Sequence, residues 1–155
     1  MREVTLEPLT RGAFAAFGDV VDAPEPGGKF VLDRTLATLG AGLSPRLTFN
    51  HAKPWSLPLE VTRMERHNRS CQCWIPLDVS RWVVTVAADR NGAPDPGSMR
   101  AFLARSDQAV NYHVGVWHHP LRTLDRSGRF AILMWTTGER GQDEEWADIP
   151  ATRMG

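Results

Sequence analysis

Five short apolar runs, separated by turn-forming residues, most strongly restrict the fold of this chain. Each run reads as a short strand, and glycine, proline, asparagine and aspartate gather between them, as in 90–98 and 125–129. Regularly spaced strands with such turns are typical of a β-sandwich or β-barrel, so we predict a mainly β fold. The expected strands are 47–51, 72–76, 82–88, 99–104 and 130–135.

A short helix is expected near the N-terminus. Thr10 can cap it, the helix can run through Phe14 and Phe17, and Gly18 can end it. The residues that follow, 22–29, are rich in proline and glycine and are predicted to form a loop.

The chain has the length of one ordinary domain, 155 residues. No repeat, low-complexity segment or linker divides it, so we predict a single domain over 1–155. The acidic stretch 141–150 is expected to be an irregular tail, with a short surface helix as the alternative.

The charge balance argues against nucleic-acid and membrane partners. There are 18 basic and 18 acidic residues, with neither a basic stripe nor a polybasic anchor. No apolar run approaches the roughly 18 residues that cross a bilayer, and the N-terminus lacks the apolar core of a signal peptide. We therefore expect a cytoplasmic protein that acts on a small molecule, with Cys71 and Cys73 reduced.

Three of the five histidines lie within seven positions of the segment 111–121, NYHVGVWHHPL. Successive strand residues face opposite sides, so these histidines cannot all face one cavity. We favour His118 as the site residue and expect His119 to face away. His113 stays open, because Gly115 can introduce a bulge that changes its direction.

An earlier segment supplies the other half of a candidate site. Glu65, His67 and Gln72 have the spacing E-x-H-x4-Q, and residues i and i+2 of a strand face the same side. Small cupin-type β-barrels present an H-x-H pair, an acidic residue a few positions on, and a later histidine after P-x-G-x-x-H. Here Gly115 to His118 matches the end of that second motif. Glu65, His67, Gln72 and His118 thus occupy the positions that a cupin uses for its metal.

Two of those four positions have changed type, which restricts the chemistry. Gln72 is a weak neutral ligand, and Glu65 in place of a histidine alters charge and softness. The site is expected either to hold a divalent ion weakly or to be a metal-free acid/base pocket. A cupin dioxygenase is disfavoured because the usual iron ligands are lost. The tryptophans, including Trp74 and Trp117, read as core or cavity-wall residues.

A series of motifs in one order carries a resemblance to a known family. The motifs are ERH at 65–67, QCWIP at 72–76, GAPD at 92–95, RAF at 100–102 and VNYH…WHHPL at 110–121, with EPLTRGAFAAFGDVVD near the start and AKPWSLPL at 52–59. This collinear set covers most of residues 6–135. It resembles the ureidoglycolate lyase family of allantoin degradation in purine metabolism.

The resemblance implies a cupin-like β-barrel, a homodimer, and cleavage of ureidoglycolate to glyoxylate and urea. It also implies a divalent ion such as nickel in some members, which the altered ligand set here would hold loosely at most. A base must remove the hydroxyl proton of the substrate, and an acid must protonate the departing nitrogen. His118 or His67 is the candidate base, or a ligand that polarises the hydroxyl oxygen, and Glu65 is the candidate acid or second proton carrier.

Further residues are expected to contact the substrate. Gln72 and Tyr112 could hydrogen-bond the ureido group. The remaining candidates are Trp74, His113 and Trp117.

The chain departs from the family pattern at 29–42, at His51 and at 134–135, where the family usually carries an Asn-rich segment, an arginine and Asp-Arg. These departures remove charge that the substrate carboxylate needs. The cations that could compensate are Lys29, Arg34, Arg46 and His51. Another small 2-hydroxy or ureido acid as substrate, or a non-catalytic module that binds small acids, therefore remain alternatives.

Overall fold

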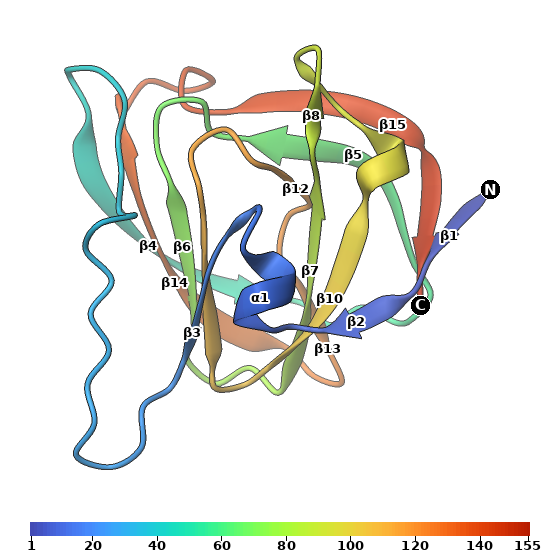
Figure 1. Ribbon diagram of the computed structural model, residues 1–155, viewed down its shortest axis with the longest axis horizontal. Coiled ribbons are helices and arrows are strands. Elements are labelled where there is room, and N and C mark those ends of the chain that lie inside the picture. Colours follow the sequence, from blue (N-terminus) through green and yellow to red (C-terminus); the bar gives the residue numbers. More distant parts are fainter.

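Strands dominate the computed structural model, which describes residues 1–155 (Figure 1). One sheet contains β1 (Arg2–Val4), β2 (Leu6–Pro8), β5 (Leu59–Arg66), β7 (Arg81–Ala87), β10 (Arg100–Arg105), β12 (Trp117–His118), β13 (Arg122–Leu124) and β15 (Glu145–Met154). The other contains β3 (Gly18–Asp22), β4 (Ser44–Ala52), β6 (Gln72–Pro76), β11 (Gln108–Tyr112) and β14 (Gly128–Thr136). The remaining elements are α1 (Arg11–Phe14), η1 (Pro96–Ser98) and the hairpin of β8 (Asp89–Arg90) and β9 (Ala93–Pro94).

The two sheets face each other and form a nearly closed barrel. The larger sheet has the order β1-β15-β5-β12-β7-β10-β2, with β13 also paired to β7, and the smaller has the order β3-β11-β6-β14-β4. Figure 1 shows the strands wrapping around one interior. The prediction of a mainly β, cupin-like barrel with a short N-terminal helix is confirmed.

Strand β7 shows how the core is divided. Its alternate residues Trp82 and Val84 join the cluster between the two sheets, together with Trp74 from β6. Val83 and Ala87 point the other way and join a second cluster. Because successive side chains of a strand face opposite sides, a strand buried on both faces must be apolar almost throughout, as β7 is.

The helix α1 begins where the sequence predicts it, but the prediction that it runs through Phe17 to Gly18 is wrong. The Thr10 hydroxyl accepts a hydrogen bond from the backbone N–H of Ala13 at 3.2 Å, which caps the first turn. The ring of Phe14 is fully buried, with centroid distances of 5.6 Å to Phe102 and 5.9 Å to Tyr112. The helix ends at Phe14, and the chain turns into β3 at Gly18. Packing of Phe14 therefore attaches this short helix to the core between the sheets.

The five expected strands are present as β4, β6, β7, β10 and β14, and residues 23–43 contain no helix or ladder strand. Strands β1, β2, β3, β5, β11 and β15 were not predicted. The structure also has no helix with the length and apolar character to cross a membrane.

The prediction that 141–150 is an irregular tail is wrong. From Glu145 onward the chain forms β15, which pairs with β5 on one side and β1 on the other. Asp148 and Arg153 on this strand are exposed, while Ile149, Thr152 and Met154 are buried. Because the segment is acidic, the alternation of exposed and buried residues that is typical of a strand was not recognised in the sequence.

The pairing of β3 with β11 requires a glycine at position 18, which lies opposite Tyr112. A methyl group there would overlap the backbone carbonyl of Asn111. We expect Gly18→Ala to lower the free energy of unfolding by about 1–3 kcal/mol, measured by urea denaturation. Gly12→Ala is the matched control, because Gly12 has open space around it and lies in α1. It should leave stability unchanged or raise it, and equal stability of the two variants would contradict the argument.

Candidate active site

Three of the predicted site residues meet inside the barrel. Glu65 lies near the end of β5, His67 follows that strand, and His118 belongs to β12. The antiparallel register places His118 directly opposite Glu65, with 3.6 Å between His118 Nε2 and Glu65 Oε1. The potential ligand atoms of all three residues lie within 4.8 Å of one another. We refer to Glu65, His67 and His118 as the triad.

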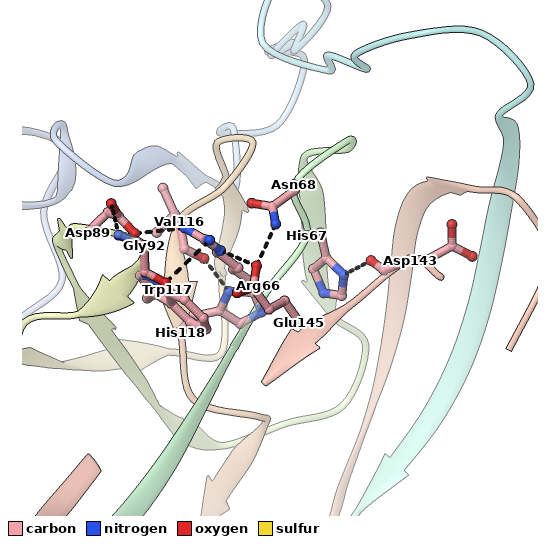
Figure 2. Close-up of polar contacts among 10 residues, drawn as sticks. All are labelled: Arg66, His67, Asn68, Asp89, Gly92, Val116, Trp117, His118, Asp143 and Glu145. Carbon is pink, nitrogen blue, oxygen red and sulfur yellow. Dashed lines mark hydrogen bonds and ion pairs between the residues drawn. The ribbon is translucent and has the colours of Figure 1, made fainter. Parts of the chain in front are cut away.

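Backbone carbonyls set the orientation of both imidazole rings (Figure 2). His67 Nδ1 lies 2.8 Å from the carbonyl oxygen of Asp143, and His118 Nδ1 lies 2.9 Å from that of Val116. A carbonyl only accepts hydrogen bonds, so each Nδ1 carries the proton and donates it. Each Nε2 then carries a lone pair, and both Nε2 atoms are buried without a hydrogen-bond partner. Two electron-pair donors thus lie beside one carboxyl group.

Aromatic side chains enclose His118. The Tyr112 ring stacks on the imidazole with centroids 4.2 Å apart and planes 10° apart, and Trp74 meets it edge-on at 5.5 Å. His118 is 1% exposed, and the Tyr112 hydroxyl is buried with no partner. These walls exclude water from the histidine side of the triad.

Burial tunes the protonation of the triad. It raises the pKa of Glu65 to about 7, and the charge of Glu144 acts in the same direction, against Arg63 and Arg122. Burial also lowers the pKa of His118 to about 3, with His67 adding to the effect. The pKa of His67 is lowered mainly by burial. The site therefore holds two neutral imidazoles beside a carboxyl group that titrates near neutral pH.

A cavity of about 250 Å³ opens beside the triad. Glu65 lines it, whereas His67 and His118 do not, so the carboxyl group separates the cavity from the histidines. The other walls come from the segment at the end of β4, from Gln72 and Trp74 on β6, from the segment after β12, and from Ile132. A larger cavity of about 500 Å³ shares Trp55 with this one, and none of the predicted site residues lines it.

Two cations line this cavity, Lys53 and Arg122, and neither was identified from the sequence. The cations proposed from the sequence were Lys29, Arg34, Arg46 and His51, and none of them lines it. A sequence signal existed, since Lys53 lies within the motif AKPWSLPL and Arg122 directly follows WHHPL. Their convergence depends on the pairing of distant segments, which the motifs alone do not reveal.

Gln72 lines the cavity with a fixed amide orientation. Its Oε1 accepts a hydrogen bond from Trp74 Nε1 at 2.7 Å, and its Nε2 contacts Met134 Sδ at 3.5 Å. The oxygen is therefore engaged, and the amide nitrogen is the group that Gln72 can offer to a ligand.

His113 and Trp117 lie away from the cavity. His113 Nε2 is 3.3 Å from Asp19 Oδ2 and is partly exposed. The Trp117 indole joins the second core cluster and donates to Asp89 Oδ1 at 3.0 Å. Tyr112 likewise lies behind His118 rather than in the cavity wall.

Arg66 fastens the strand end that carries Glu65 and His67 (Figure 2). Its guanidinium donates to Glu145 Oε2 at 2.8 Å and to Asp89 Oδ1 at 2.7 Å. It also lies 4.4 Å from the centre of the Trp117 ring. This network joins β5 to β15, β8 and β12 next to the triad.

A family model and several related proteins that match this chain all have the same description. The chain matches the model of a family described as ureidoglycolate lyase over residues 1–152. A putative ureidoglycolate lyase from Agrobacterium fabrum is 40% identical over 142 residues, which cover 91% of this chain and 88% of that protein. A ureidoglycolate lyase from Burkholderia cepacia is 43% identical over 138 residues, covering 83% and 77%. One from Stutzerimonas stutzeri is 35% identical over 143 residues, covering 86% and 83%.

The raised pKa of Glu65 predicts a dependence of stability on pH. The carboxyl group has an ordinary value of 4.5 and a value of about 7 in the folded protein, so the folded state binds the proton more tightly between these limits. The resulting stabilisation is complete below about pH 4.5 and is lost as the pH rises through 7. Glu65→Gln removes this titration.

The difference in unfolding free energy, wild type minus Glu65→Gln, should fall by about 2–4 kcal/mol as the pH rises from 4.5 to above 7. Urea denaturation in the presence of a chelator measures it, and a difference that does not change with pH would contradict the assigned environment.

Proposed function

This chain belongs to the ureidoglycolate lyase family, and from that premise we propose that it cleaves ureidoglycolate to glyoxylate and urea in the degradation of allantoin. The observation that carries the proposal is the placement of one carboxyl group. Glu65, with a pKa of about 7, lines a small cavity that also contains two cations. The family relationship and this geometry support the same chemistry.

The reaction moves one proton over a short distance. In ureidoglycolate one carbon carries a hydroxyl group, a ureido nitrogen and a carboxylate. Removal of the hydroxyl proton lets the oxygen form the carbonyl of glyoxylate, while the carbon–nitrogen bond breaks and its electron pair goes to the nitrogen. That nitrogen takes up a proton and leaves as urea. The protons balance, so a single group can remove the first and deliver the second.

We assign this proton transfer to Glu65. A carboxyl group with a pKa near neutral pH can accept a proton from the hydroxyl group and release it to the nitrogen. His118 and His67 were the candidate bases from the sequence, but both are neutral, buried and outside the cavity wall. His118 serves instead to position Glu65, because its Nε2 lone pair faces Glu65 Oε1 at 3.6 Å.

Gln72 and Trp74 are proposed to contact the ureido part of the substrate. The amide nitrogen of Gln72 can donate to the ureido carbonyl oxygen, since Trp74 already occupies the amide oxygen. The Trp74 ring forms a flat wall for the planar ureido group. Asn50 lines the same cavity and adds a further amide.

We also propose that the triad can hold a divalent ion. The Nε2 atoms of His67 and His118 are buried without partners, and a Glu65 oxygen lies within 4.8 Å of both. Imidazole nitrogens suit nickel among other transition metals. The oxygen of Gln72 is engaged with Trp74, which leaves three protein donors and favours loose binding. When bound, the ion would polarise the hydroxyl oxygen of the substrate.

The test of this proposal is turnover by the purified protein. Wild type should release glyoxylate and urea in equal amounts from ureidoglycolate. Glu65→Gln should lower kcat by about 10²-fold or more, because it removes the proton carrier, and His118→Ala should lower it on the same scale. Glu60→Gln, an exposed change on the same strand, is the control and should keep the wild-type rate.

Two outcomes would overturn parts of this scheme. Near-normal turnover by Glu65→Gln would remove Glu65 from the mechanism. Failure of the wild type to form glyoxylate, both with added divalent metal and with a chelator, would exclude the lyase activity itself.

We further propose that the protein is a homodimer. Strand β4 is the last strand of the smaller sheet and has one unpaired edge. Leu47 and Phe49 on this strand are 57% and 70% exposed, and the register aligns them with Leu133 and Ala131 on β14. The row of Phe49 and Ala131 continues to Ile75 on β6, which is also exposed. An exposed apolar edge of this kind is normally covered, and a second copy can cover it with the same surface.

Phe49→Glu should convert the dimer to a monomer, because it places a charge at the centre of this apolar surface. Light scattering coupled to gel filtration measures the mass. Leu39→Glu is the matched control, since Leu39 is 56% exposed but lies in the 23–43 loop. A monomeric wild type, or a Phe49→Glu variant that stays dimeric, would contradict this interface.

We propose that the protein works in the cytoplasm as a single domain spanning 1–155. The cysteines Cys71 and Cys73 are buried and unpaired, as expected in a reducing compartment. The strands β1 and β2 pair with β15 and β10, so both ends of the chain belong to one sheet.

A further inference from the structure

Arg122 is a partly buried cation without a carboxylate partner. Its Nη1 donates to the carbonyl oxygen of the neighbouring Leu121 at 2.7 Å, and its Nε is buried with no hydrogen-bond partner. Arg81 on the surface, by contrast, makes two hydrogen bonds to Asp125. A guanidinium that is removed from water with unused donors is unfavourable unless an anion joins it. The chain itself supplies no such anion in contact with Arg122.

Arg122 is nevertheless held in place. The centre of its guanidinium lies 4.3 Å from the centroid of the Trp55 ring. The backbone N–H of Trp55 donates to the carbonyl oxygen of Thr123 at 2.8 Å, and the Thr123 hydroxyl donates to that of Lys53 at 3.0 Å. These bonds join the segment 53–55 to the start of β13. Stacking on an aromatic face leaves the N–H edges of a guanidinium free for an acceptor.

Arg122 is part of the wall of the cavity that Glu65 lines. Arg122, Lys53 and Trp55 all contribute to its walls. Burial lowers the pKa of Arg122, and the charge of Glu65 raises it. The two groups therefore interact electrostatically, although they do not form an ion pair. The cavity thus offers two positive groups, Lys53 and Arg122, against one carboxyl group, that of Glu65. A pair of cations in one cavity attracts a small anion.

We propose that Arg122, stacked on Trp55 and assisted by Lys53, binds the carboxylate of the substrate and selects small carboxylic acids over their neutral analogues. The assignment of the substrate rests on the function proposed above. A carboxylate can accept two parallel N–H bonds from one guanidinium, which fixes its orientation as well as its position. The adjoining carbon then lies in the cavity that Glu65 lines, where its hydroxyl group and nitrogen can meet the proton carrier.

Binding of simple acids tests this anchor without any turnover. Glycolate is a 2-hydroxy acid, and glycolamide is its neutral amide. Titration of each into ¹⁵N-labelled protein should shift the Nε–H resonance of Arg122 for glycolate and not for glycolamide. Arg122→Gln should weaken glycolate binding about 10- to 100-fold, the scale of hydrogen bonds to a charged group, and leave glycolamide binding unchanged. Arg90→Gln, an exposed change on β8, is the control and should bind both as wild type does.

Kinetics give a second, independent measurement. Arg122→Gln should raise KM for ureidoglycolate by more than it lowers kcat, because the anchor acts in the bound substrate as well as in the transition state. Arg122→Lys keeps the charge without the paired N–H groups and should recover part of the loss. If Arg122→Gln does not fold, the KM and the glycolate affinity of Arg122→Lys test the anchor in its place.

The outcomes separate this inference from the lyase proposal. Equal binding of glycolate and glycolamide by wild type, or unchanged glycolate affinity and KM in Arg122→Gln, would overturn the anchor even if the enzyme cleaves ureidoglycolate. Selective glycolate binding that depends on Arg122, in a protein that forms no glyoxylate, would support the anchor and exclude the lyase activity.

Discussion

The pairing of β12 with both β5 and β7 is the constraint on which fold and site depend. This two-residue strand joins the half of the larger sheet that contains β5 and β15 to the half that contains β7 and β10. The same pairing brings His118 opposite Glu65 and turns Trp117 to the other face, where Asp89 binds its indole. Just before it, Gly115 has a φ of 79° and donates to the His67 carbonyl at 2.9 Å. The triad is therefore a direct product of sheet closure.

Burial then gives the triad its chemistry. Removal from water disfavours charge on every member, so the imidazoles stay neutral while the carboxyl group retains its proton up to a higher pH. The carbonyls of Asp143 and Val116 fix which imidazole nitrogen carries the proton. Both lone pairs consequently belong to Nε2. The two lone pairs beside Glu65 are the feature on which both the proposed proton transfer and the proposed weak binding of a cation rest.

The sequence predicted five of the strands, and the spacing of three site residues, but it did not reveal the remaining strands. Strand β6 occupies the predicted residues 72–76, and the spacing of Glu65 and His67 correctly placed both beside His118. The alternation rule fails where the chain turns, and it does so between Tyr112 and β12. His113 therefore lies next to Asp19 instead of the cavity. Strand β15 was not predicted for a different reason. Its composition is acidic, and its extended conformation depends on pairing with β5 and β1.

The cations of the cavity could not be found by inspection of motifs, because their position depends on bonds between distant segments. The hydrogen bonds from Trp55 to Thr123 and from Thr123 to Lys53 help to bring Lys53 and Arg122 together. These cations and the carboxyl group of Glu65 belong to separate segments, 53–55 with β13 in one case and β5 in the other. The positive charge beside Glu65 therefore does not depend on the strand that carries this carboxyl group. The cavity contains two cations even though His51 stands where the family resemblance predicts an arginine.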